Sequence, residues 1–202
     1  MRLGLLTDIH EATDLLRDAL RELQNEQIDQ IVVIGDIFEM GQRIEETCRL
    51  LREAGAVGVW GNHDYGLCVD PYPETREKYP ASVFSYKLTL KPRLEVADCY
   101  FSHIEPWLDP EDLADLWYFH GPPDEAWKRD RIFNAAPARM IFMGHYHRWL
   151  VVTPERLLDW NGQTPIELSG GSFMVVVDAL LNGSFAVYDT ETAVLTPFNL
   201  KS

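Results

Sequence analysis

The first third of the chain alternates short apolar runs with longer amphipathic stretches. Residues 3–7, 31–34 and 57–60 are apolar runs of a length that suits buried strands. Thr13 can cap a helix with one apolar stripe, formed by Leu15, Leu16, Ala19, Leu20 and Leu23. A second helix is predicted over Ile44, Cys48 and Leu51 and closed by Gly55. This βαβαβ order predicts a parallel sheet with right-handed crossovers.

The later chain is richer in short β-type runs. Strands are predicted at residues 85–90, 94–96, 99–102 and 140–143. Two Asn-Gly pairs, Asn161-Gly162 and Asn182-Gly183, are typical of hairpins. Residues 104–138 interrupt these runs with a segment rich in Trp and Asp that we expect to be helical. The layout predicts an α/β (α+β) domain with a mixed sheet, or two facing sheets, flanked by helices.

Composition fits one cytoplasmic domain. The 202 residues suit a single domain over 1–202, and 46% hydrophobic with 25% charged residues is ordinary for a globular protein. No apolar run reaches the roughly 18 residues of a membrane span, and the N-terminal run is too short for a signal peptide. The three cysteines, Cys48, Cys68 and Cys99, are odd in number and scattered, which favours a reducing compartment.

The formal net charge of −14 limits the classes of molecule that we expect this protein to bind. Such a surface repels long nucleic acids and anionic membranes, so we expect neither as a partner. Bound cations could reverse the potential at one site. A small anionic molecule held at a cation site is therefore compatible with the charge.

Polar side chains follow each of five predicted strands. The segments are Thr7-Asp8-Ile9-His10, Gly35-Asp36, Gly61-Asn62-His63-Asp64, His103 and Gly144-His145-Tyr146-His147. Five of the six histidines lie in these segments, and only His120 lies outside them. In open α/β sheets, ligands bind at the carboxyl ends of the strands. The distribution therefore predicts a functional site at these strand ends.

The residue types in these segments are metal ligands. Carboxylates, an amide oxygen and imidazoles suit borderline-hard divalent ions, and cysteine is absent from the set. Asp8 and His10, like His145 and His147, are two residues apart, so in an extended segment each pair would face one side. Seven candidates are too many for one ion, and suit two ions that share a carboxylate: Asp8, His10, Asp36, Asn62, His103, His145 and His147.

The order Asp-x-His, Gly-Asp, Gly-Asn-His-Asp, His, Gly-His-x-His resembles the signature of the calcineurin-like metallophosphoesterase superfamily. The resemblance spans Asp8 to His147 and includes every block. It implies an αββα four-layer fold, a β-sandwich of two mixed sheets flanked by helices. It also implies hydrolysis of phosphomonoesters or phosphodiesters at two divalent metal ions. We expect Mn²⁺ first, with Fe, Zn²⁺, Ni²⁺ or Mg²⁺ as alternatives.

The same resemblance assigns roles to residues. Asp8, His10 and His147 would hold one ion, Asp36 would bridge, and Asn62, His103 and His145 would complete the second. His63 would act near the leaving group or the phosphoryl oxygens, with Asp64 orienting its imidazole. Both are therefore predicted catalytic residues.

Two departures and one alternative limit the resemblance. The Gly-Asp block continues Ile37-Phe38-Glu39-Met40, without the Asp-Arg-Gly of the serine/threonine phosphatase branch. The third block ends in Asp64 rather than Glu, which also argues against that branch. The small size and short spacers resemble the compact bacterial or archaeal phosphoesterases. Some members of the superfamily are non-catalytic scaffold or binding subunits. Here every ligand block and His63 are retained, which favours an enzyme.

Each of these residues also has an ordinary explanation when taken alone. The two aspartates could cap helices, Asn62 could form a turn, His103 could be a core residue, and the last two histidines could lie on a surface turn. Their occurrence together in one order favours the site.

The segment at about 104–138 has two interpretations. It starts and ends beside predicted ligands, so it could form a helical cap over a small-molecule phosphoester, including a nucleotide. Its aromatic and basic residues would then meet the substrate, and replacing Trp127 or Arg131 would test this. The full set is Trp107, Trp117, Tyr118, Phe119, His120, Trp127, Lys128, Arg129 and Arg131. Core packing and a solvated helix face are the alternative.

Overall fold

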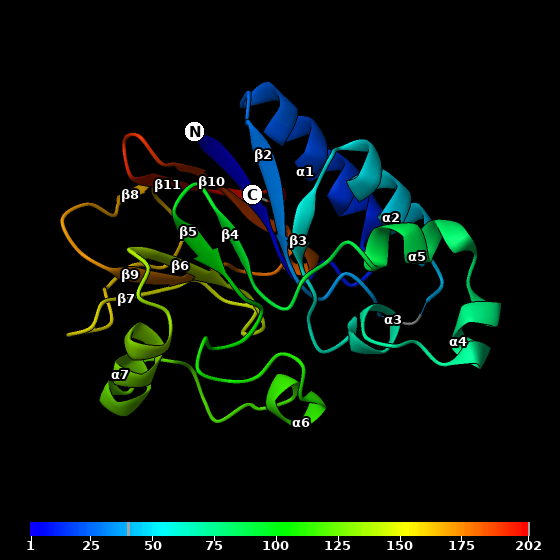
Figure 1. Ribbon diagram of the computed structural model, residues 1–202. Helices are drawn as coiled ribbons and strands as arrows, with labels where there is room; N and C mark the ends of the chain where they lie inside the picture. Colours follow the sequence, from blue (N-terminus) through cyan, green and yellow to red (C-terminus); the bar gives the residue numbers. More distant parts are fainter. Residues whose placement is uncertain (40, 202) are drawn as a thin grey trace.

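The computed structural model describes residues 1–39 and 41–201. Two β-sheets pack face to face, and helices cover the outer faces of both sheets (Figure 1). This arrangement confirms the predicted sandwich of two mixed sheets flanked by helices.

The first sheet has six strands, and its parallel half is the predicted βαβαβ unit. Across the sheet the order is β3 (Val57–Val59), β2 (Gln30–Ile34), β1 (Arg2–Leu6), β10 (Ser184–Asp189), β11 (Val194–Asn199) and β8 (Ile166–Glu167). The strands β1, β2 and β3 are parallel, connected by α1 (Thr13–Asn25) and α2 (Ile44–Glu53). The strands β10, β11 and β8 pair antiparallel, which makes the sheet mixed.

The second sheet has five strands and is also mixed. Its order is β4 (Leu94–Val96), β5 (Cys99–Phe101), β6 (Met140–Met143), β9 (Phe173–Val176) and β7 (Leu150–Val152). The three central strands are parallel, and the edge strands β4 and β7 are antiparallel. The remaining helices are α3 (Tyr65–Cys68), α4 (Pro73–Lys78), α5 (Ala81–Lys87), α6 (Leu113–Leu116), α7 (Ala126–Ala135) and the 3₁₀ turn η1 (Leu180–Asn182).

Alternation along the strands divides the apolar residues among the layers. Leu5 and Phe142 face the core between the sheets, whereas Leu6 packs in the core shared with α1 and α2. Ile141 packs on the opposite side, in the core that contains Ile132 of α7. Because successive strand side chains point to opposite faces, fully apolar strands serve two cores at once.

Three local predictions were wrong. Thr13 is the first residue of α1 and Ala12 occupies its N-cap position. Residues 85–90 are not a strand, because α5 runs to Lys87 and buries Val83, Phe84 and Tyr86 at helical spacing. The two Asn-Gly pairs do not form two-residue hairpins, since each lies on a connection between strands of different sheets.

Within the described residues, no helix combines the length and apolar character needed to cross a membrane.

Candidate metal centre

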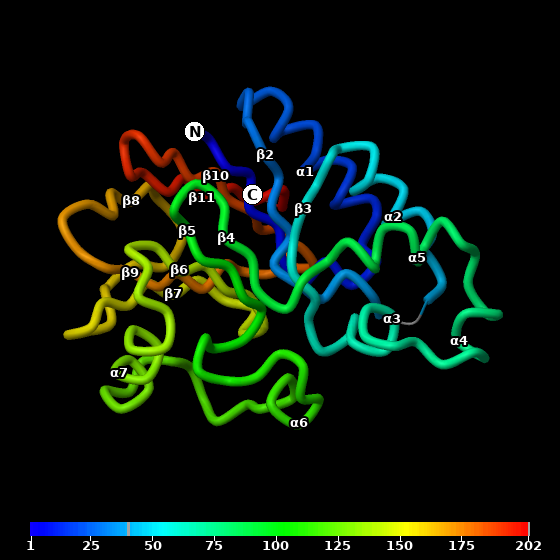
Figure 2. Tube along the Cα trace, viewed as in Figure 1, coloured from blue at the N-terminus to red at the C-terminus, as the bar shows by residue number. Residues whose placement is uncertain are grey.

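The predicted ligands follow the carboxyl ends of parallel strands in both sheets. Asp8 and His10 follow β1, Asp36 follows β2, and Asn62 follows β3. His103 follows β5 in the second sheet, and two histidines follow β6, namely His145 and His147. Figure 2 traces the chain from the lower end of β3 toward α3, the stretch that carries Asn62, His63 and Asp64. The topology therefore brings distant segments to one edge, as the strand-end pattern predicts.

The backbone at this edge is strained. Asp8, His10, Asp36, His145 and His147 all have positive φ angles, between 45° and 70°. A non-glycine residue in this region loses roughly 1–2 kcal/mol, and such residues cluster at functional sites. The extended geometry expected for the pairs Asp8/His10 and His145/His147 is therefore wrong, because all four residues have left-handed backbone conformations.

Two glycines of the motifs are needed for close approach. A Cβ on Gly61 would lie 2.2 Å from Asp36 Oδ1, and a Cβ on Gly144 would lie 2.0 Å from Thr7 Oγ1. Neither position has space for a side chain. The glycine before each polar block thus lets neighbouring strand ends meet.

Asp8, His10 and His147 form the first ligand group. His147 Nε2 lies 3.1 Å from Asp8 Oδ1 and 3.3 Å from His10 Nε2. Asp8 is fully buried, and its Oδ2 accepts hydrogen bonds from the Thr7 hydroxyl and the His145 N–H. Its Oδ1 is buried, and apart from His147 Nε2 it has no polar partner among the described residues. A cation between these atoms would satisfy that oxygen.

Asp36, His103 and His145 form the second group, with Asn62 between the histidines. His103 Nε2 lies 3.2 Å from Asp36 Oδ2 and 3.1 Å from Asn62 Oδ1. His145 Nδ1 lies 3.1 Å from the same Asn62 oxygen. In each of the two groups, the ligand atoms of the His and Asp residues lie within 4.8 Å of one another. The His145/His147 pair is divided between the groups, as the resemblance implies.

Backbone carbonyls fix the imidazoles with a lone pair toward the centre. His103 Nδ1 donates to the Ile34 carbonyl at 2.7 Å, and His145 Nε2 donates to the Tyr118 carbonyl at 3.3 Å. A carbonyl oxygen can only accept, so in the neutral rings the other nitrogen is unprotonated. That nitrogen then faces the Asn62 oxygen, which is also an acceptor. Acceptors directed at one point are the arrangement that a cation stabilises.

The pKa shifts agree with this geometry. Burial opposes the charge on Asp36, but His103 and the His63 N–H outweigh it and hold the pKa of Asp36 well below its usual range. Burial likewise opposes a charge on His103, but Asp36 raises its pKa to about 10. Burial and the charge of His103 lower the pKa of His145 to about 4. A metal ion would replace the proton on His103 and find Asp36 already ionised.

His63 lies at the open side of the centre. Its backbone N–H donates to Asp36 Oδ1 at 3.0 Å, which ties it to the predicted bridging ligand. Its ring stands edge-on to His10, with ring centroids 4.8 Å apart. The side chain is 27% exposed, so it can meet a bound substrate.

Asp64 does not orient His63, which corrects the sequence-based assignment. Its carboxylate is fully buried and accepts the N–H groups of Ile37, Phe38 and Gly61. It also pairs with Lys87 of α5, which is equally buried. Asp64 therefore joins the loops after β2 and β3 and acts as a structural residue.

Glu39 is the carboxylate beside His63, and the sequence reasoning missed it. Its Oε2 lies 2.9 Å from His10 Nδ1 and 3.4 Å from His63 Nδ1. A carboxylate on the outer nitrogen of a ligand imidazole orients the ring and raises its basicity. The available sequence signal was an acidic residue three positions after Asp36.

Glu11 shapes the loop that carries Glu39. Its buried carboxylate accepts the N–H groups of Glu39, Gly41 and Arg43 at 3.1, 2.6 and 2.7 Å. A cavity of about 220 Å³ lies on this loop, lined by His10, Glu11, Glu39, Gln42 and Arg43. The first ligand group thus opens to solvent beside Arg43.

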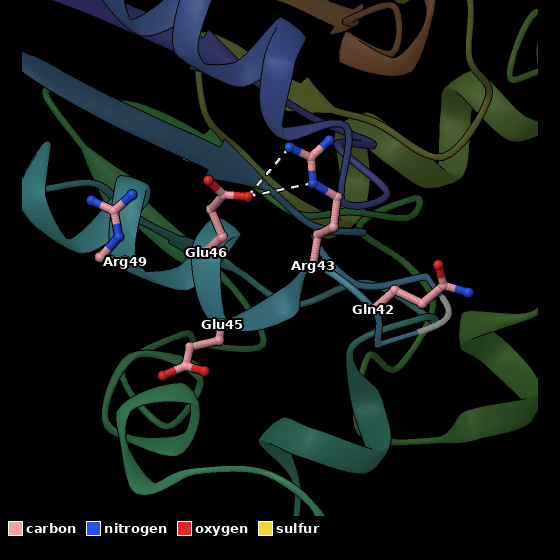
Figure 3. A pocket seen from close by; sticks show the side chains of 5 residues that line it. All are labelled: Gln42, Arg43, Glu45, Glu46 and Arg49. Carbon is pink, nitrogen blue, oxygen red and sulfur yellow. Dashed lines mark hydrogen bonds and ion pairs between the residues drawn. The ribbon is translucent and has the colours of Figure 1, made fainter.

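A neighbouring hollow of about 370 Å³ lies along α2 (Figure 3). Arg43 and Glu46 pair within it, while Arg49 and Glu45 point away from that pair. Among the described residues that line it, none is a predicted ligand.

The segment 104–138 is built from two short helices, α6 and α7, and connecting loops. Trp117, directly after α6, lies beside His63, and Phe119 lies beside His145. Arg131 instead lies against two neighbouring tryptophans, with its guanidinium 4.9 Å from the Trp107 ring centroid and 5.4 Å from that of Trp127. The aromatic residues therefore divide into two sets. Trp117 and Phe119 lie at the centre, whereas Trp107 and Trp127 pack around Arg131 of α7.

Residues 1–192 match the calcineurin-like phosphoesterase superfamily domain, and the chain belongs to that family. An uncharacterized protein of Methanocaldococcus jannaschii is 25% identical over 210 residues, which cover 93% of this chain and 82% of the relative.

Two solved structures share the fold. The metallophosphoesterase from Sphaerobacter thermophilus is 21% identical with a TM-score of 0.79, over 98% of this chain and 87% of that one. A putative diadenosine tetraphosphatase is 18% identical with a TM-score of 0.59, over 97% and 93%. At these identities, the likeness concerns the fold alone.

Proposed function

We propose that this protein is a dinuclear metal-dependent phosphoesterase that hydrolyses phosphomonoesters or phosphodiesters of small molecules. The observation that carries the proposal is the convergence of acceptor atoms from five strand ends. Asp8 Oδ1, Asp36 Oδ2, the Asn62 oxygen and imidazole nitrogens meet there. Membership in the phosphoesterase superfamily supports the reaction class.

Two divalent ions, when bound, would supply Lewis-acid stabilisation of the phosphoryl oxygens and lower the pKa of the attacking water. In this assignment Asp8, His10 and His147 hold one ion and Asn62, His103 and His145 hold the other, with Asp36 between them. Imidazole ligands outnumber carboxylates, which favours Mn²⁺, Fe or Zn²⁺ over Ca²⁺. We propose Mn²⁺ as the native metal.

His63 gives the leaving group its proton in this proposal. Its partial exposure and its place beside the open side of the centre support the role. Glu39 Oε2 lies 3.4 Å from Nδ1 of His63, where it can orient the ring. General-acid catalysis of this kind contributes about 10²–10⁴-fold.

The net charge of −14 favours small substrates over long nucleic acids, because cations concentrate positive charge at one place only. We further propose a cytoplasmic location, which the odd and scattered set of cysteines supports.

The test is turnover of a chromogenic aryl phosphate and a bis-aryl phosphate after chelation and reloading with Mn²⁺. The proposal predicts activity that disappears with the metal and returns with it. Elemental analysis of the same samples reports the ions bound. A protein that carries its metals but turns over neither ester would support the alternative, a non-catalytic binding subunit of this fold.

A further inference from the structure

Trp117 presents an exposed indole beside His63. The side chain is 55% exposed, and its ring centroid lies 5.2 Å from that of His63 at an angle of 49°. Exposed apolar surface rimmed by polar residues is typical of ligand-binding grooves. Its position is therefore the first indication of a ring-binding surface.

The loop before Trp117 is fastened to the same chain stretch that carries His63. Trp60 Nε1 donates to the Pro110 carbonyl at 2.9 Å, and the Tyr65 hydroxyl donates to the Glu111 carbonyl at 2.8 Å. Trp60 and Tyr65 flank His63 on either side in the sequence. The indole and the imidazole are thus held in one frame, so little ordering is needed when a ligand enters.

The two residues after Trp117 reach the other side of the centre. The Tyr118 carbonyl accepts from His145 Nε2, and the Phe119 ring centroid lies 6.0 Å from that of His145. Phe119 is 57% exposed. Three consecutive residues therefore line the mouth, with Trp117 on the His63 side and Phe119 on the opposite side.

The tryptophan of α7 has a different environment. Trp127 packs against Trp107 and Arg131, and its Nε1 donates to Glu125 at 2.5 Å. The sequence-based hypothesis gave Trp127 and Arg131 the substrate contact, whereas the geometry favours Trp117. Trp127 becomes a matched control in the same segment.

We propose that Trp117 is the stacking platform for a planar ring on the leaving group, which makes nucleoside and aryl phosphoesters the substrate class. This inference rests on the proposed function, since His63 must lie at the leaving oxygen. The phosphorus–oxygen bond to the ring-bearing arm breaks, that oxygen takes the proton of His63, and water supplies the oxygen that stays on phosphorus. The departing arm then lies against the indole.

The kinetic test compares matched substrates on wild type, Trp117→Ala, Trp117→Phe and Trp127→Ala. Adenosine 5′-phosphate and ribose 5-phosphate both leave through the 5-oxygen of ribose, and they differ in having adenine or a hydroxyl at C1. Their methyl diesters differ in the same way, and phenyl phosphate represents the aryl class. Trp117→Ala should lower kcat/KM on the ring-bearing members by about 10- to 100-fold, the range for base–aromatic stacking, and on the ribose members less than about twofold. Trp117→Phe should retain most of the activity, and Trp127→Ala should change neither.

The methyl diester of adenosine 5′-phosphate gives a second readout. A platform on the leaving-group side predicts adenosine and methyl phosphate as products. Release of adenosine 5′-phosphate and methanol, or an equal loss on both members of each pair, would overturn the assignment.

A binding measurement separates this inference from the proposed function. Adenosine should quench the tryptophan fluorescence of the metal-free protein, and Trp117→Phe should abolish that quenching while Trp127→Phe retains it. Equal quenching in both variants, or none in the wild type, would contradict the platform. Lack of turnover on every ester would overturn the proposed function, and the titration would still decide on Trp117.

Discussion

The two sides of the candidate metal centre differ in how their side chains are held. On the buried side, Asp8, Asp36 and His103 are at most 2% exposed, and each makes a hydrogen bond, the two aspartates as acceptors and His103 as donor. On the open side, His63 is 27% exposed and Glu39 is 43% exposed. The difference teaches that burial and hydrogen bonds hold the ligands at the base of the centre, while its exposed edge presents groups that can meet a substrate.

Asp36→Asn should have the largest effect, because it changes the predicted ligand between the two groups on the buried side. The amide removes one negative charge between the two ligand groups and offers one oxygen instead of two. We expect loss of at least one ion and of detectable phosphoesterase activity. Elemental analysis and an ester assay measure both, with the exposed Asp130→Asn as the control. Full metal content in an active Asp36→Asn protein would remove the bridging role.

His63→Ala removes the imidazole from the open side and leaves the ligands of the buried side unchanged. The variant should keep its metals and lose about 10²–10⁴-fold in turnover of esters with poor leaving groups. The loss should be smaller for nitrophenyl esters, whose leaving group needs no proton. Parallel kinetics on both ester types, with metal content measured on the same protein, check this prediction. An identical loss on both would argue against proton donation.

Lys87→Met tests whether the buried side depends on its internal ion pair. The substitution leaves the Asp64 carboxylate buried without its charged partner, although Ile37, Phe38 and Gly61 still donate to it. Breaking such a pair costs about 3–5 kcal/mol in the free energy of unfolding. Urea unfolding of Lys87→Met and of the exposed control Lys91→Met gives the difference. A loss below about 1 kcal/mol would mean that the backbone donors suffice.

Glu39→Gln should produce the smallest effect of the four. The amide can still hydrogen bond to His10 and His63, but it carries no negative charge and offers one oxygen instead of two. A decrease of about 10–100-fold in metal affinity or activity is expected for a partner of this kind. The matched control is Glu53→Gln, whose carboxylate pairs with Arg49 on α2. Unchanged activity and metal affinity would make Glu39 a surface residue.

The sequence predicts the buried side better than the open side. Every predicted ligand lies in one of the two groups or against them, because parallel strands place their carboxyl ends at one edge whatever the details of packing. The neighbour of His63 was misassigned for a local reason. Asp64 is the N-cap residue of α3 and has a helical backbone conformation, and adjacent residues on a helical turn do not face one another.

The contact of Glu39 could not be predicted for a different reason. It depends on the positions of Glu39, Gly41 and Arg43, whose backbone N–H groups Glu11 holds through long-range hydrogen bonds. Residues 85–90 were mistaken for a strand because polar and apolar residues alternate along Ser-Tyr-Lys-Leu-Thr-Leu, whereas α5 occupies Ala81–Lys87. Tertiary burial, which the local pattern does not carry, decided that element.

Anomalous diffraction from a crystal of the Mn²⁺-loaded protein tests the central claim most directly. The account predicts two peaks roughly 3.5–4 Å apart. One should lie among Asp8, His10 and His147, the other among Asn62, His103 and His145, and Asp36 should contact both. A single peak, or peaks away from these side chains, would contradict the dinuclear centre on which the proposed phosphoesterase function depends.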